Sequence, residues 1–109
     1  MENLLFFLQR ITALILAPFV LIHLGLILYA VRGGLTAADI LSRTEGSIGW
    51  ILFYGIFVVA VAIHASLGLR RIFIEWLKIG TSAVNILSFL IALLMLALGL
   101  RAVIAVGGL

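Results

Sequence analysis

The sequence predicts an all-α membrane protein with three transmembrane helices. Of its 109 residues, 66% are hydrophobic and only 10% are charged, whereas an ordinary soluble domain carries about 25% charged residues. The mean hydropathy is +1.43. Three separate apolar segments are each long enough to cross a bilayer, since a helix needs about 20 residues to span roughly 30 Å of hydrocarbon. We therefore expect one transmembrane domain over residues 1–109 and no separate soluble domain.

The three apolar segments give the expected helices in order. Their predicted bounds are about 4–31, 48–76 and 83–105. Pro18 lies in the middle of the first helix, where the loss of one backbone hydrogen bond predicts a modest kink. Residues 32–46 contain turn formers and four charges, so they are predicted to be a loop. Residues 70–82 are partly amphipathic, and we expect them to continue the second helix past the membrane surface.

The distribution of charge fits a membrane partner and no nucleic acid. The net charge is +3, but the basic residues occur singly or in pairs at predicted helix ends, where membrane proteins usually keep them. A cytoplasmic N-terminus would place four basic residues inside and three outside, and we adopt that orientation. The inside set is Arg10, Arg70, Arg71 and Lys78, and the outside set is Arg32, Arg43 and Arg101. The chain has no cysteine, so disulfides and thiolate metal sites are excluded.

His64 is the first candidate site residue, because an ionisable side chain at membrane depth is a functional-site hypothesis by default. Helical spacing places Gly68, Arg71 and Glu75 on the same face as His64. A bulky, planar, anionic cofactor such as haem needs a ligand nitrogen, space beside it and a nearby cation. For the nitrogen that does not bind iron, the nearest acceptor in a helix is the carbonyl of Ala60.

His23 on the first helix is the second candidate. At 1.5 Å per residue, His23 lies about 20 Å and His64 about 10 Å from the inner interface. One iron cannot comfortably bind both at that offset. Either each histidine ligates its own haem with a histidine of another chain, or only His64 is a ligand and His23 is a hydrogen-bonded buried residue.

Each arginine in or near the predicted spans could bind a ligand or could lie at the membrane interface without a ligand. Arg10 is flanked by apolar residues, so its guanidinium could hold a haem propionate or a quinone carbonyl through charge-assisted hydrogen bonds. Arg70 and Arg71 could instead be interfacial residues whose stems lie along apolar surface while their charged ends reach water. In the third helix, Asn85 and Ser88 are expected to serve helix packing.

Two short motifs resemble those of the cytochrome b membrane anchors of succinate dehydrogenase (complex II) and of its fumarate reductase relatives. The motif of the second helix reads His64-x3-Gly68-x-Arg70-Arg71-x3-Glu75. The motif of the first helix, Arg10-Ile-Thr12-Ala13, is similar to the Arg-x-Ser/Thr-Gly/Ala motif of the same anchors. Three spans in about 110 residues also fit. The chain has traits of both the larger and the smaller anchor subunit of that family.

The resemblance implies a haem and a quinone site. It makes His64 an axial ligand of haem b, with Gly68 and Arg71 beside the porphyrin and Arg10 on a propionate or the quinone. His23 suits the two-haem members, in which the first two helices each supply a histidine.

For quinone, the resemblance points to Thr12, Glu75 and Trp76 in addition to Arg10. Two departures stand out. Trp76 replaces a tyrosine that hydrogen-bonds quinone, although its indole N–H can still donate. Phe6 replaces a serine of the larger subunit's quinone site.

The implied function is that of a non-catalytic, electron-carrying anchor in a bacterial or archaeal cytoplasmic membrane. A flavoprotein subunit would carry the succinate or fumarate chemistry, and an iron–sulfur subunit would pass electrons to quinone. One or two haem b groups would be shared with a second anchor chain in a haem-binding bundle. Three alternatives remain: a haem-free structural anchor of the same complex, an assembly subunit without a cofactor, and a small oligomeric transporter. Against the transporter, no carboxylate lies inside the apolar spans, which cover about 4–31, 48–69 and 83–104.

Overall fold

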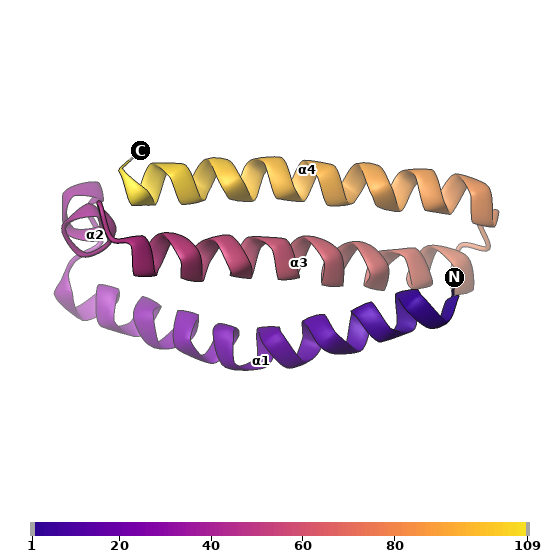
Figure 1. Cartoon of the computed structure of the whole chain (residues 1–109), viewed down its shortest axis with the longest axis horizontal. Coiled ribbons are helices and arrows are strands. Elements are labelled where there is room, and N and C mark those ends of the chain that lie inside the picture. Colours follow the sequence, from indigo (N-terminus) through magenta and orange to yellow (C-terminus); the bar gives the residue numbers. More distant parts are fainter. Residues whose placement is uncertain (1, 109) are drawn as a thin grey trace.

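The computed structural model describes residues 2–108, and these form four α-helices and no strand. The helices are α1 (Glu2–Gly33), α2 (Ala37–Thr44), α3 (Ile48–Glu75) and α4 (Thr81–Gly107). The three long helices lie side by side with α3 in the middle (Figure 1). Each is long and apolar enough to cross a membrane. The predicted all-α membrane fold is confirmed, and each long helix begins and ends within about two residues of its expected bounds.

The two ends of the bundle differ. The N-terminus and the connection from α3 to α4 lie together at one end, here called the N-terminal end (Figure 1). The short helix α2 and the end of α4 lie at the opposite end, here called the α2 end. α1 remains helical through Pro18 and is bent near its middle (Figure 1). This bend agrees with the kink expected where proline removes a backbone hydrogen bond.

The prediction of a loop over residues 32–46 was wrong for Ala37–Thr44, which form α2. A capping box starts this helix: the backbone N–H of Asp39 donates to Thr36 Oγ1 at 3.1 Å, and the backbone N–H of Thr36 donates to the Asp39 carboxylate at 3.4 Å. The Thr36 hydroxyl also donates to this carboxylate and lowers the pKa of Asp39. The Thr-x-x-Asp pattern of Thr36 and Asp39 is the sequence feature that could have predicted the start of this helix.

The α2 end is closed by hydrogen bonds to the last turn of α4. Thr44 Oγ1 donates to the backbone oxygen of Val106 at 2.7 Å. The backbone N–H of Gly46 donates to the oxygen of Gly107 at 2.9 Å. Gly46 has a φ of +73°, a conformation that favours glycine. Because these bonds satisfy carbonyls that a helix end leaves free, α2 is fixed against α4.

α3 and α4 approach each other closely because small residues lie between them. Ala62 and Ser66 of α3 and Ser88 of α4 are buried. Gly99 of α4 lies so near Val58 that a Cβ at position 99 would overlap the Val58 side chain. Such small residues are what membrane helices use to pack without help from the hydrophobic effect. Most other large apolar side chains are exposed, as expected for a surface that meets lipid or other membrane subunits.

We expect Gly99→Ala to destabilise the α3–α4 pair by about 1–3 kcal/mol, because a β-branched neighbour cannot easily move aside for the new methyl group. The measurement is the midpoint of thermal unfolding of the detergent-solubilised protein. Gly25→Ala is the matched control, since no atom lies within 4 Å of the position of its new Cβ. Equal midpoints for the two variants would contradict the close approach of α3 and α4.

Candidate functional site

The imidazole of His64 contacts a side chain of the neighbouring helix α1. His64 Nδ1 lies 3.3 Å from Thr12 Oγ1. Thr12 is only 4% exposed and His64 is half-buried, so most of this contact lies within the protein. The sequence pointed to the carbonyl of Ala60 as the partner of His64, but the structure gives the Thr12 hydroxyl instead. The prediction of the Ala60 carbonyl was wrong because it considered only acceptors within the same helix.

The continuous helix α3 keeps His64, Gly68 and Arg71 in the helical spacing that the sequence analysis used. The space beside Gly68 is not empty, however. A Cβ at position 68 would lie 3.6 Å from the amide nitrogen of Gln9, which is ordinary contact distance. Gln9 is therefore a neighbour of the His64 face that the sequence analysis did not select. Its position one helical turn from Thr12 within the Gln9-Arg10-Ile-Thr12 string was the available signal.

His23 lies nearer the α2 end, among aromatic rings. Its ring centroid is 5.3 Å from that of Phe57 and 6.0 Å from that of Tyr54, both edge-to-face. Its Nδ1 atom is buried and has no hydrogen-bond partner in the described residues. A buried polar atom left unpaired costs about 1–3 kcal/mol.

A cavity of about 600 Å³ adjoins His23 between α1, α2 and α3. Its walls include the aromatic side chains of Tyr29, Trp50 and Tyr54, and Arg43 of α2. The Arg43 guanidinium lies over the Tyr29 ring, 5.2 Å from its centroid. Cavities of this size and aromatic character are typical of sites for small molecules and cofactors. The helix that the sequence analysis missed thus forms one wall of this cavity.

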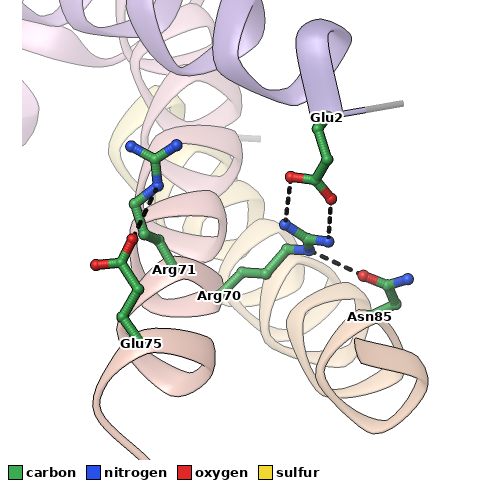
Figure 2. Close-up of polar contacts among 5 residues, drawn as sticks. All are labelled: Glu2, Arg70, Arg71, Glu75 and Asn85. Carbon is green, nitrogen blue, oxygen red and sulfur yellow. Dashed lines mark hydrogen bonds and ion pairs between the residues drawn. The ribbon is translucent and has the colours of Figure 1, made fainter. Parts of the chain in front are cut away.

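Arg70 is buried at the N-terminal end and is not an interfacial residue reaching water. Only 7% of it is exposed. Its Nη2 and Nη1 atoms donate to the two Glu2 carboxylate oxygens at 2.8 and 3.3 Å, and its Nε donates to Asn85 Oδ1 at 2.8 Å (Figure 2). We call these three side chains the arginine clamp. The clamp joins α1, α3 and α4, and it gives Asn85 the packing role expected from the sequence.

The neighbouring Arg71 is exposed and faces away from the clamp (Figure 2). Its Nε lies 3.9 Å from Glu75 Oε1, a loose pair one helical turn apart. Trp76 follows the last residue of α3 and is 79% exposed. Arg10 is also exposed, and its guanidinium lies 5.5 Å from the centroid of the Phe6 ring. Arg71 and Arg10 are therefore available to acidic or carbonyl groups of a ligand or a partner.

The residues expected to bind quinone do not enclose a pocket together in this chain. Arg10, Glu75 and Trp76 are exposed at the surface, whereas Thr12 is buried beside His64. A small cavity of about 70 Å³ does open at the N-terminal end. It is lined by Glu2, Leu5, Phe6, Gln9, Leu67, Arg70 and Arg71. Of these lining residues, Phe6 was singled out from the sequence, whereas Glu2 and Gln9 were not.

The comparisons with known proteins bear on this membrane fold and on the two motifs. A family model described as the succinate dehydrogenase/fumarate reductase transmembrane subunit matches residues 2–103. The chain belongs to this family. No curated protein and no solved structure matches the chain. The transmembrane subunit is therefore an integral membrane protein that works with partner subunits in a complex, and the suspected resemblance is confirmed.

For the arginine clamp of this transmembrane subunit, we expect Asn85→Leu to lower stability by about 1–3 kcal/mol. The substitution leaves a donor of the buried guanidinium without an acceptor. Thermal unfolding of the solubilised complex measures the effect. Glu75→Gln is the control, because an exposed ion pair contributes little. If both variants unfolded at the wild-type temperature, the result would contradict a stabilising role of the clamp.

Proposed function

We propose that this transmembrane subunit is a haem b-binding membrane anchor of a succinate:quinone oxidoreductase. It would hold the flavoprotein and iron–sulfur subunits at the membrane and help pass electrons to quinone. The observation that carries the proposal is His64, an imidazole inside a membrane-spanning helix with one ring nitrogen placed against Thr12. An ionisable side chain at that depth calls for a function.

The residues around His64 fit a haem. A histidine nitrogen is one of the side-chain ligands that hold haem iron, and His64 is half-buried in the middle helix with Ala65 and Gly68 at neighbouring helical positions. Arg71 and Arg10 are the exposed cations that would pair with propionates. A bound haem b would supply one-electron transfer, with a potential tuned by its axial ligand, hydrogen bonds and burial.

A second anchor chain is part of the proposal because three helices arranged in a row cannot surround a porphyrin (Figure 1). His64 would supply one ligand nitrogen to the iron, and a second ligand would come from the other anchor chain. The many exposed apolar side chains of α1, α3 and α4 leave a large surface for such a chain and for lipid.

The N-terminal end is the place for the iron–sulfur subunit and for quinone in this proposal, with the N-terminus in the cytoplasm. Exposed Glu75 and Trp76 lie there and would border the quinone. Arg10 and the small cavity next to Gln9 would complete the polar surroundings of its carbonyls. In this reading the clamp keeps the ends of the three helices in place beneath the extramembrane subunits. Succinate or fumarate chemistry would belong to the flavoprotein.

A second haem at the α2 end is the other candidate function of this chain. It is favoured by the half-buried imidazole of His23 on α1 and by the adjoining cavity of about 600 Å³ that His23 lines. Together they would make His23 the axial ligand of a distal haem and His64 that of a proximal one. The alternative for His23 is a purely structural residue packed among aromatic rings.

We expect His64→Ala to abolish the proximal b-type signal while the chain still inserts and assembles. The measurement is a reduced-minus-oxidised spectrum of the purified complex, with a pyridine haemochrome assay of haem per flavin. A full b-type spectrum in the variant would refute the assignment. A wild-type complex without an α band would favour the haem-free structural anchor.

The variant His23→Ala tests whether the complex binds one haem or two. If the α2 end holds a distal haem, this variant loses about half of the haem per flavin, because each histidine serves its own iron. An unchanged haem content in His23→Ala, combined with loss in His64→Ala, would leave His64 as the sole haem ligand of this chain. Membrane insertion, measured on the membrane fraction, is the control for both variants.

A further inference from the structure

The contact between Thr12 and His64 specifies which atom donates the proton. Thr12 Oγ1 lies 2.8 Å from the backbone oxygen of Leu8 and 3.0 Å from that of Gln9. Both are carbonyl oxygens, which only accept hydrogen bonds. Two oxygens at 2.8 Å need a proton between them, so the single proton of the Thr12 hydroxyl points to the Leu8 carbonyl. Thr12 can then only accept from His64.

This assignment determines the tautomer of the imidazole. If Thr12 accepts, the proton of neutral His64 is on Nδ1, and the lone pair is on Nε2. The acceptor side of this contact is buried, since Thr12 is only 4% exposed. The imidazole is therefore prepared to bind a metal through Nε2 before any metal is present. The opposite tautomer would leave two acceptors, Nδ1 and the hydroxyl oxygen, facing each other at 3.3 Å.

We propose that Thr12 of α1 is a positioning residue for the iron ligand on α3. This inference rests on the proposed function and replaces the quinone contact that the motif suggested for Thr12. A hydrogen bond to the outer nitrogen of a ligating histidine holds the ring orientation and makes the ligand more basic. Arg10, two residues earlier, is exposed and lies over Phe6. The two residues of the Arg-x-Thr motif therefore have different roles. Arg10 is available to a ligand or partner at the surface, and Thr12 orients His64.

The consequence is that the haem site depends on the pairing of α1 with α3. Thr12 and His64 are 52 residues apart, and their contact crosses between the two helices. The Thr12 hydroxyl is itself held by its bond to the preceding turn of α1. The ring orientation of His64 is therefore set by a neighbouring helix as well as by α3.

The test compares Thr12→Val with Thr12→Ser in the complete complex. Valine keeps the branched shape without an acceptor oxygen, whereas serine keeps the hydroxyl. For Thr12→Val we expect the apparent haem affinity to fall about 10-fold, as is typical when a partner of a metal ligand is removed. The midpoint potential of the remaining haem should rise, since a less basic imidazole stabilises ferric iron less. Thr12→Ser should stay close to wild type in both measurements.

Haem per flavin at limiting haem measures the affinity, and a spectroscopic redox titration measures the potential. Thr12→Ala takes the place of the valine variant if that variant does not assemble. The inference is overturned if removal of the hydroxyl changes neither quantity, or if serine changes them as much as valine does. The His64→Ala spectrum distinguishes the two proposals. A full b-type haem content in His64→Ala overturns the proposed function itself, whereas loss of the proximal haem there with wild-type behaviour of Thr12→Val overturns only the role of Thr12.

Discussion

Polar groups inside hydrocarbon must find their partners within the protein, and the middle helix α3 is where this constraint acts most strongly. α3 carries an imidazole in its apolar span and a buried guanidinium near its last turn, and each is bonded to a neighbouring helix. His64 contacts α1 through Thr12, and Arg70 contacts both α1 and α4 through the clamp. Because α3 lies between the other two long helices, it can satisfy both groups. The same bonds join three helices that the hydrophobic effect does not hold together in lipid.

The polar groups are unevenly divided between the ends of the bundle. At the N-terminal end, Arg70 is neutralised inside while its neighbour Arg71 stays exposed. Adjacent positions on a helix point about 100° apart, so one motif supplies both a structural cation and an available one. At the α2 end, backbone and hydroxyl hydrogen bonds close the helix termini, and an aromatic cavity remains beside His23. His64 lies between these ends.

Hydropathy and helical spacing were sufficient to predict the three long helices and the shared face of His64, Gly68 and Arg71. They were not sufficient for α2, because turn-forming glycines and charges outweighed a capping box that only Thr36 and Asp39 reveal. Contacts between helices could not be predicted from the sequence either. Sequence spacing does not tell which of two adjacent arginines turns toward Glu2, since that depends on where the N-terminus lies. The acceptor for His64 was missed for the same reason, because a local carbonyl is a plausible partner until α1 is placed.

The central claim is that His64 is an iron ligand oriented by Thr12, and an experimental structure of the assembled complex tests it most directly. Our account predicts porphyrin density bonded to His64 Nε2, with Thr12 Oγ1 within hydrogen-bond distance of Nδ1. Density that shows lipid or protein side chains against Nε2, and no porphyrin beside α3, would contradict it.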